Sequence, residues 1–137
     1  MTTIFEPKMD KKQVAQMSAL ALAHIGDAVF ELLVRTKLCL DGGTTNGKLH
    51  RETVARVCAA SQAVLSERLL PLLSEDERDY FRRGRNAHTH AAPKSVTPVQ
   101  YAKATGVEAL FGALYLLGER ERIAELFAAV TEEAYAV

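Results

Sequence analysis

The spacing of polar residues is most unusual in the stretch from residue 19 to residue 34. The only polar residues in it are His24, Asp27 and Glu31. Their offsets of three and four place them in one narrow stripe on a helix, and every other face of that helix is apolar. This pattern predicts a helix over about residues 18–40 that is buried nearly all round. An unpaired ion taken out of water is costly, so the acids on such a helix need a cationic partner or a metal.

A second predicted helix, over residues 98–118, has the same character. Thr97 is a suitable N-cap, and Gly118 suits the position after the last turn. After Lys103, the only charge in this helix is Glu108. Two apolar helices that each carry a carboxylate, with no cation close by in sequence, indicate a shared divalent cation.

We therefore predict that Asp27 and Glu108 bind a metal ion, with Glu31 as a further candidate ligand. Carboxylate oxygens favour Mg²⁺, for which Mn²⁺ can substitute. The alternative is that the acids form ordinary ion pairs, Asp27 or Glu31 with Arg35 and Glu108 with Lys103.

Three neighbours of these acids have open interpretations. Gly26 and Gly112 permit either close packing of the two helices or space for metal and substrate, and Thr105 is small enough to leave room beside Glu108. His24 is expected to be a core residue or a hydrogen-bond donor to a metal ligand.

Other parts of the chain also show helical patterns, and no useful length alternates with period two. Ser74 and Glu77 form a capping-box pattern. The pattern predicts an all-α fold of one domain over residues 1–137. Its expected parts are an irregular arm over 1–10, a short helix to Met17, a helical region over 46–70, a helix over 74–84, a loop over 85–97 and a helix over 119–134.

The composition mainly excludes classes of protein, namely membrane-spanning and secreted ones. A chain of 137 residues that is 48% hydrophobic is long enough to bury the core of one domain. No membrane span and no secretory signal are recognisable, so we expect a cytoplasmic protein without a membrane partner. Cys39 and Cys58 have no metal-ligand spacing, and we interpret them as reduced, mostly buried thiols.

The formal net charge of zero hides a strong segregation of charge. Arg82, Arg83 and Arg85, followed by Asn86, form a basic segment that suits phosphate oxygens. The alternative is a solvated helix end, because cations also favour a helix C-terminus. Further candidates for contact with a nucleic-acid backbone are Lys94, Lys48 and His50.

These motifs resemble a known family. The segment Ile25–Leu32 (IGDAVFEL) resembles the signature helix of the ribonuclease III catalytic domain, and Thr105–Gly118 resembles its second acidic helix. With Arg82–Ala87 (RRGRNA) and Lys48–His50 (KLH), the set resembles the bacterial Mini-ribonuclease III branch.

The resemblance implies a ribonuclease III-type helical fold, a homodimer, and Mg²⁺-dependent cleavage of double-stranded RNA to 5′-phosphate and 3′-hydroxyl ends. The substrate implied is precursor 23S ribosomal RNA in the cytoplasm, with a ribosomal protein as a candidate helper. Asp27 takes the place of the family's metal-binding aspartate and Glu108 that of its metal-bridging glutamate. Ala23 and Thr105 stand where longer members carry acids, so the number of metals per site stays open.

The longer members also carry a double-stranded RNA-binding domain, and this sequence has none. We therefore expect the basic segment and the dimer surface to bind the RNA. Two other functions remain open: a catalytically silent RNA-binding or ribosome-associated module on the same fold, and a di-metal helical phosphohydrolase acting on small phosphates.

Overall fold

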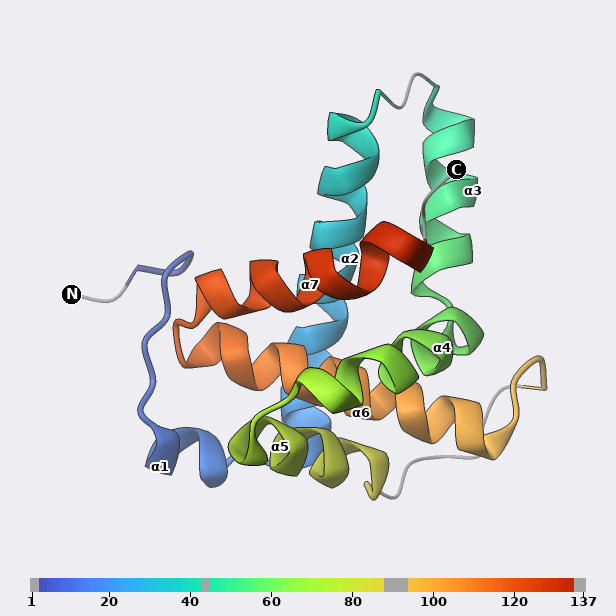
Figure 1. Cartoon of the computed structure of the whole chain (residues 1–137). Helices are drawn as coiled ribbons and strands as arrows, with labels where there is room; N and C mark the ends of the chain where they lie inside the picture. The colour runs from blue at the N-terminus through green and yellow to red at the C-terminus, as the bar shows by residue number, and fades with distance from the viewer. Residues whose placement is uncertain (1–2, 43–44, 88–93, 135–137) are drawn as a thin grey trace.

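A computed structural model describes residues 3–42, 45–87 and 94–134, and it confirms the predicted all-α fold. Within these ranges the only β-type pairing is an isolated bridge between Thr3 and Glu6. None of the described helices is long and apolar enough to cross a membrane. The elements are α1 (Lys11–Ala15), α2 (Ala19–Leu40), α3 (Asn46–Val57), α4 (Ala59–Leu69), the 3₁₀ turn η1 (Leu70–Leu72), α5 (Glu75–Arg85), α6 (Pro98–Leu116) and α7 (Arg120–Ala134) (Figure 1).

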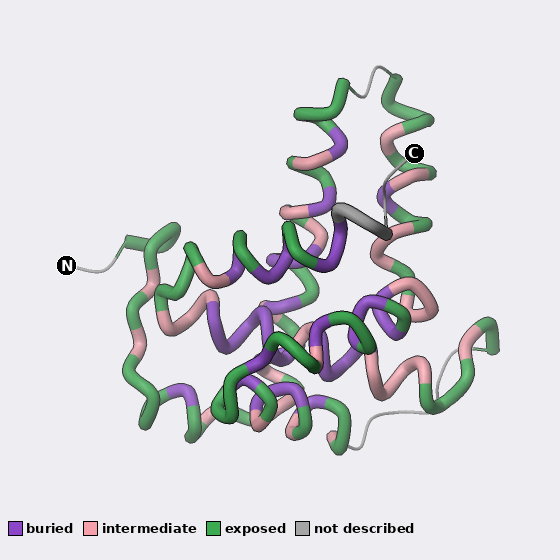
Figure 2. Tube along the Cα trace, in the orientation of Figure 1, coloured by how far each residue is buried: buried purple, intermediate pink, exposed green. Residues whose placement is uncertain are grey.

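Helix α6 lies at the centre of the molecule and contacts α2, α4, α5 and α7. Thr97 caps it as predicted, and Gln100 completes a capping box. Apart from the half-buried Glu108, every residue of α6 from Ala104 to Leu114 is buried, and Figure 2 shows the buried residues in purple. The prediction of a helix buried nearly all round is therefore confirmed for α6.

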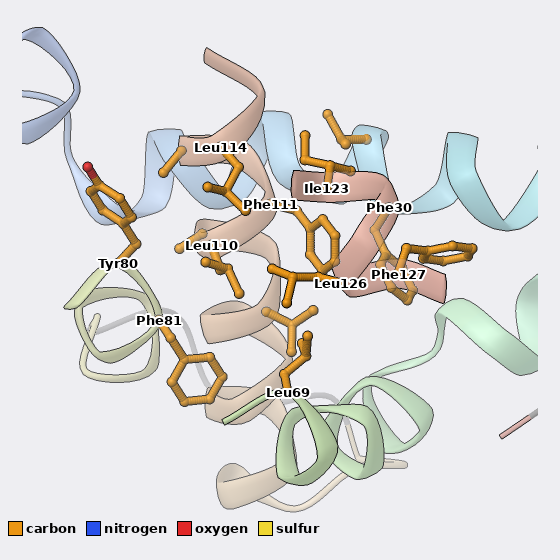
Figure 3. Packing of buried hydrophobic residues seen from close by; sticks show 14 of the residues in the cluster. Phe30, Leu69, Tyr80, Phe81, Leu110, Phe111, Leu114, Ile123, Leu126 and Phe127 are labelled. Atoms are coloured by element: carbon orange, nitrogen blue, oxygen red, sulfur yellow. The ribbon is translucent and has the colours of Figure 1, made fainter. Parts of the chain in front are cut away.

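Large side chains from five helices fill the core around α6 (Figure 3). The ring of Phe30 on α2 meets Phe111 of α6 edge-on at a centroid distance of 5.7 Å, and it meets Phe127 of α7 at 5.9 Å. Leu69 of α4 and Phe81 of α5 complete the cluster from the other side of α6. Aromatic edge-to-face pairs of this kind fix the positions of the helices that carry them.

Helix α2 differs from its prediction, because one of its faces is not covered. Leu32 and Leu20 have 59% and 44% of their surfaces exposed, and Ala28 is also exposed. The opposite face, with Leu22, Phe30 and other apolar residues, packs on the core. The polar stripe is thus only one part of a wider exposed face, and the prediction that α2 is buried nearly all round was wrong.

The helical region predicted over 46–70 is divided at Cys58. This residue ends α3 and begins α4, and its extended backbone (φ −63°, ψ 156°) bends the chain between them. Cys58 and Cys39 are free thiols, as predicted, but both are exposed rather than buried.

The capping box at Ser74 and Glu77 is present at the start of α5. This helix continues to Arg85, so the predicted loop over 85–97 begins only at Asn86 and the three arginines lie on the helix. Residues 88–93 of that loop, with His88 and His90, lie outside the described residues.

Helices α5 and α7 are joined by a buried ion pair. The Glu77 side chain is 7% exposed, and Nε and Nη2 of Arg122 each donate to its carboxylate at 2.8 Å. Nη2 also donates to the carbonyl oxygen of Leu72 at 2.8 Å. The pairing with Arg122 holds the pKa of Glu77 below its ordinary value of 4.5.

We expect Glu77→Gln to lower the free energy of unfolding by about 2 kcal/mol at neutral pH, because Arg122 loses its buried charge partner and keeps only the exposed Glu125. A depressed pKa stabilises the fold above the ordinary value, and this stabilisation is lost as the pH falls through the folded-state pKa. The difference between wild type and variant, measured by urea unfolding, should therefore vanish in acid. A difference that stays constant with pH would contradict this role.

Candidate active site

Helices α2 and α6 cross with their backbones in contact, at Gly26 and Gly112. A Cβ atom on Gly26 would lie 1.6 Å from the carbonyl oxygen of Glu108, and one on Gly112 would lie 1.9 Å from that of Leu22. No side chain fits at either position. The two glycines therefore serve close helix packing, and the space beside Gly112 is filled by the backbone of α2 rather than left for a ligand.

This crossing brings Asp27 and Glu108 together from different helices. Asp27 follows Gly26 and is exposed, whereas Glu108 is half-buried. The pKa of Glu108 is raised to about 9, chiefly by burial and then by hydrogen bonding to Asp27 and by the charge of Asp27. A hydrogen bond from the side chain of Gln62 acts the other way and lowers this pKa.

The ion pairs considered as alternatives do not involve these two acids. Lys103 pairs with Glu67 on α4, and Arg35 Nη2 lies 2.9 Å from Glu31 Oε2. In the described part of the chain, no lysine or arginine forms an ion pair with Asp27 or Glu108. Of the three acids, Glu31 is the one that forms the ion pair with Arg35 that was considered as the alternative to metal binding. To bind a metal with the oxygen that faces Arg35, Glu31 would have to break this pair.

The side chains at the crossing suit a hydrated Mg²⁺ or Mn²⁺ ion. All available donors are oxygens, and the two carboxylates already contact each other although both carry negative charge when ionised. Within the described ranges, no group of three or more His, Cys, Asp and Glu side chains could hold a metal. The protein would thus supply few ligands, which matches an ion that keeps several waters.

Neither Ala23 nor Thr105 adds a ligand to the site. Ala23 is buried in the core, and the Thr105 hydroxyl donates to the carbonyl oxygen of Tyr101 at 3.0 Å. His24 is exposed, which excludes the core alternative, and its role as a hydrogen-bond donor to a metal ligand stays a prediction.

Gln62 is the residue of this site that the sequence analysis missed. It belongs to α4, is 2% exposed and contacts Glu108. Its Oε1 atom is buried and has no hydrogen-bond partner among the described residues. The only sequence signal was an uncharged polar residue within an apolar stretch of a predicted helix.

The arginines predicted to bind RNA differ in their surroundings. Arg82 is exposed and pairs with Asp79, and Arg85 is exposed beside Asn86. Arg83 is half-buried, and its Nη2 donates to the carbonyl oxygen of Met17 at 2.6 Å. Arg83 therefore ties the end of α5 to the α1–α2 connection.

The other candidates for RNA contact lie apart from these arginines. Lys48 and His50 are exposed on α3, which packs along the C-terminal half of α2, whereas α5 lies at the other end of the molecule (Figure 1). Lys94 is exposed in the segment that leads into α6. Within the described ranges, the candidates do not form one patch on the chain.

The chain is similar to known proteins both in sequence and in structure. A family model described as the ribonuclease III domain matches residues 20–119. Curated relatives include Mini-ribonuclease 3 of Thermoanaerobacter sp. (strain X514), 47% identical over 128 residues, which span 91% of this chain and 90% of the relative. Mini-ribonuclease 3 of Symbiobacterium thermophilum is 46% identical over 113 residues, 82% of this chain and 87% of the relative. A crystal structure of a Fusobacterium nucleatum protein matches with a TM-score of 0.78 and 32% identity, over 87% of this chain and 95% of that one.

Proposed function

Because this chain belongs to the ribonuclease III family, in its Mini-ribonuclease III branch, we propose that it is a Mg²⁺-dependent endoribonuclease that cleaves double-stranded RNA. Its proposed substrate is precursor 23S ribosomal RNA in the cytoplasm, with Mn²⁺ able to replace Mg²⁺. The observation that carries the proposal is the contact of Asp27 with Glu108 across the α2–α6 crossing, where no lysine or arginine of the described ranges pairs with either acid.

In this proposal Asp27 and Glu108 hold the metal. When bound, Mg²⁺ activates a water and stabilises charge on the scissile phosphate. Exposure of Asp27 leaves the site open to a large substrate, whereas the burial of Glu108 fixes its carboxylate. Glu108 must lose its proton to act as a ligand, and a nearby divalent cation lowers the pKa of a carboxyl group.

We propose that two copies of the chain associate through the uncovered apolar surface between α2 and α7. A groove there is lined mostly by apolar side chains, and Leu32 is its most prominent exposed member on α2. Exposed apolar patches of this kind mark association surfaces. A two-fold dimer presents two equivalent sites, which suits cleavage of both strands of a duplex. The groove residues that support this are Phe5, Val29, Leu32, Leu33, Tyr115 and Ile123.

Arg82 and Arg85 are the best-placed arginines for phosphate contact, because Arg83 is engaged with Met17. We expect the double variant Arg82→Ala/Arg85→Ala to weaken duplex binding and to reduce the salt slope by roughly one for each phosphate that an arginine no longer neutralises. Filter binding across a salt series measures both quantities.

The matched control is Lys11→Ala/Lys37→Ala, which removes the same charge from surface ion pairs with Asp76 and Asp41. It should leave the slope close to that of the wild type. If the two double variants show the same salt dependence of duplex binding, the basic segment does not contact RNA phosphates.

The direct test of the proposal is incubation of structured duplex RNA, such as precursor 23S ends, with Mg²⁺ and then with a chelator. The proposal predicts cleavage only with Mg²⁺. A catalytically silent RNA-binding module, which the small number of carboxylates would permit, predicts binding under both conditions and cleavage under neither.

A further inference from the structure

Gln62 has a buried amide whose hydrogen bonds are only partly satisfied. Its Nε2 donates to the carbonyl oxygen of Val57 at 2.8 Å. Since a carbonyl can only accept, this contact requires that the nitrogen of the amide faces Val57. Oε1 is the atom left without a partner among the described residues.

The hydrogen bond to Val57 explains why a donor is present at residue 62, but it does not explain the oxygen of the amide. The chain bends at Cys58, so the last carbonyls of α3 need donors from outside the helix. Ser61 meets the same need by donating its hydroxyl to the carbonyl oxygen of Ala55 at 2.5 Å. A side chain with only a donor would serve the Val57 carbonyl equally well, whereas a buried oxygen without a partner destabilises the fold.

The position of Gln62 next to the α2–α6 crossing accounts for its unpaired oxygen. Helix α4 packs against α6, and the Gln62 side chain lies close enough to Glu108, the deeper of the two acids at the α2–α6 crossing, to lower the pKa of its carboxyl group. Gln62 is therefore joined to a metal-ligand candidate through its amide, and it holds a free acceptor in the same buried surroundings.

We propose that Gln62 is a positioning residue of the metal centre: its amide nitrogen orients the Glu108 carboxylate, and Oε1 accepts a hydrogen bond from a water of the bound cation. This inference rests on the proposed function of Asp27 and Glu108 as ligands. Mg²⁺ keeps several of its waters, and the O–H groups of those waters need acceptors. Partners that orient a metal ligand typically change metal affinity by about 10–100-fold.

The test is calorimetric titration of the full chain with Mn²⁺, without RNA, after circular dichroism has verified the fold of each variant. Gln62→Met removes both polar atoms at similar volume, and we expect it to bind Mn²⁺ about 10–100-fold more weakly. Gln62→Glu loses the nitrogen that donates to Val57 and orients Glu108, but it keeps oxygen acceptors for the waters of the ion, so it should bind Mn²⁺ more tightly than Gln62→Met does. Ser61→Ala, which removes a donor from the same bend away from Glu108, should leave the affinity unchanged.

The outcomes distinguish an error about Gln62 from an error about the metal centre itself. A residue that only caps Val57 predicts the same behaviour for Gln62→Met and Gln62→Glu, and this result would overturn the inference about Gln62. If Asp27→Asn binds Mn²⁺ as tightly as the wild type, the proposed metal centre itself is wrong.

A second measurement needs no variant and therefore does not depend on folding. In the wild-type protein, the side-chain ¹⁵N and amide proton signals of Gln62 should shift on addition of Mg²⁺, and those of Gln100 at the start of α6 should not. Unshifted Gln62 signals at a saturating Mg²⁺ concentration would also overturn the inference.

Discussion

Asp27→Asn should abolish cleavage of duplex RNA while the fold and the association of the chain remain intact. Asn keeps the size of the side chain and one oxygen, but it removes the charge that the proposed metal requires. If about 4 kcal/mol of transition-state stabilisation depends on the metal, cleavage should fall by roughly a thousandfold. The fold should not suffer, because Asp27 is exposed and its charge opposes ionisation of Glu108.

The matched control is Asp41→Asn, at the exposed C-terminal end of the same helix. Asp41 Oδ2 pairs with Lys37 Nζ at 3.1 Å, far along α2 from the crossing. Initial rates on a defined RNA duplex should be close to wild type for Asp41→Asn. An Asp27→Asn protein that retained comparable rates would remove Asp27 from the active site.

Gly26→Ala should be among the most destabilising single-methyl changes in the chain. The added Cβ would lie 1.6 Å from the Glu108 carbonyl oxygen and 2.8 Å from the Gly112 nitrogen, and both atoms belong to the backbone. Because backbone cannot move aside as a flexible side chain can, α2 and α6 must separate. We expect a loss of more than about 3 kcal/mol in the free energy of unfolding, a large share of the stability of an ordinary domain.

Gly47→Ala is the control for this prediction, since Gly47 is exposed in the first turn of α3. Its added Cβ would meet only the guanidinium of Arg51, at 3.5 Å. Alanine favours the helical state over glycine, so this variant should gain up to about 1 kcal/mol. Urea unfolding of both proteins measures the contrast, and similar stabilities would contradict the close crossing of α2 and α6.

Helix positions were largely predictable because they depend on local signals. Ser74 and Thr97 each accept a hydrogen bond from the first turn of a helix, where their sequence context indicated an N-cap. The contact between Asp27 and Glu108 was predictable for a different reason. Both acids interrupt apolar helices, and no nearby base offered either of them an obvious partner.

What escaped prediction depends on tertiary packing. The sequence does not reveal which apolar face of α2 packs on α6, so the exposure of Leu32 was missed. Glu31 and Asp27 are equivalent in the periodic pattern, and only the structure assigns Arg35 to Glu31. Gln62 carries no charge and belongs to no recognisable motif, so its contact with Glu108 appears only when α4 is placed against α6.

In the proposed active site, Asp27 and Glu108 share a divalent ion between α2 and α6. The sharpest test is anomalous diffraction from crystals of the wild-type protein grown with Mn²⁺. We predict an anomalous peak in contact with both carboxylates, and no peak at that position in crystals of Asp27→Asn. Full occupancy elsewhere on the protein, with no peak between these two acids, would contradict the account.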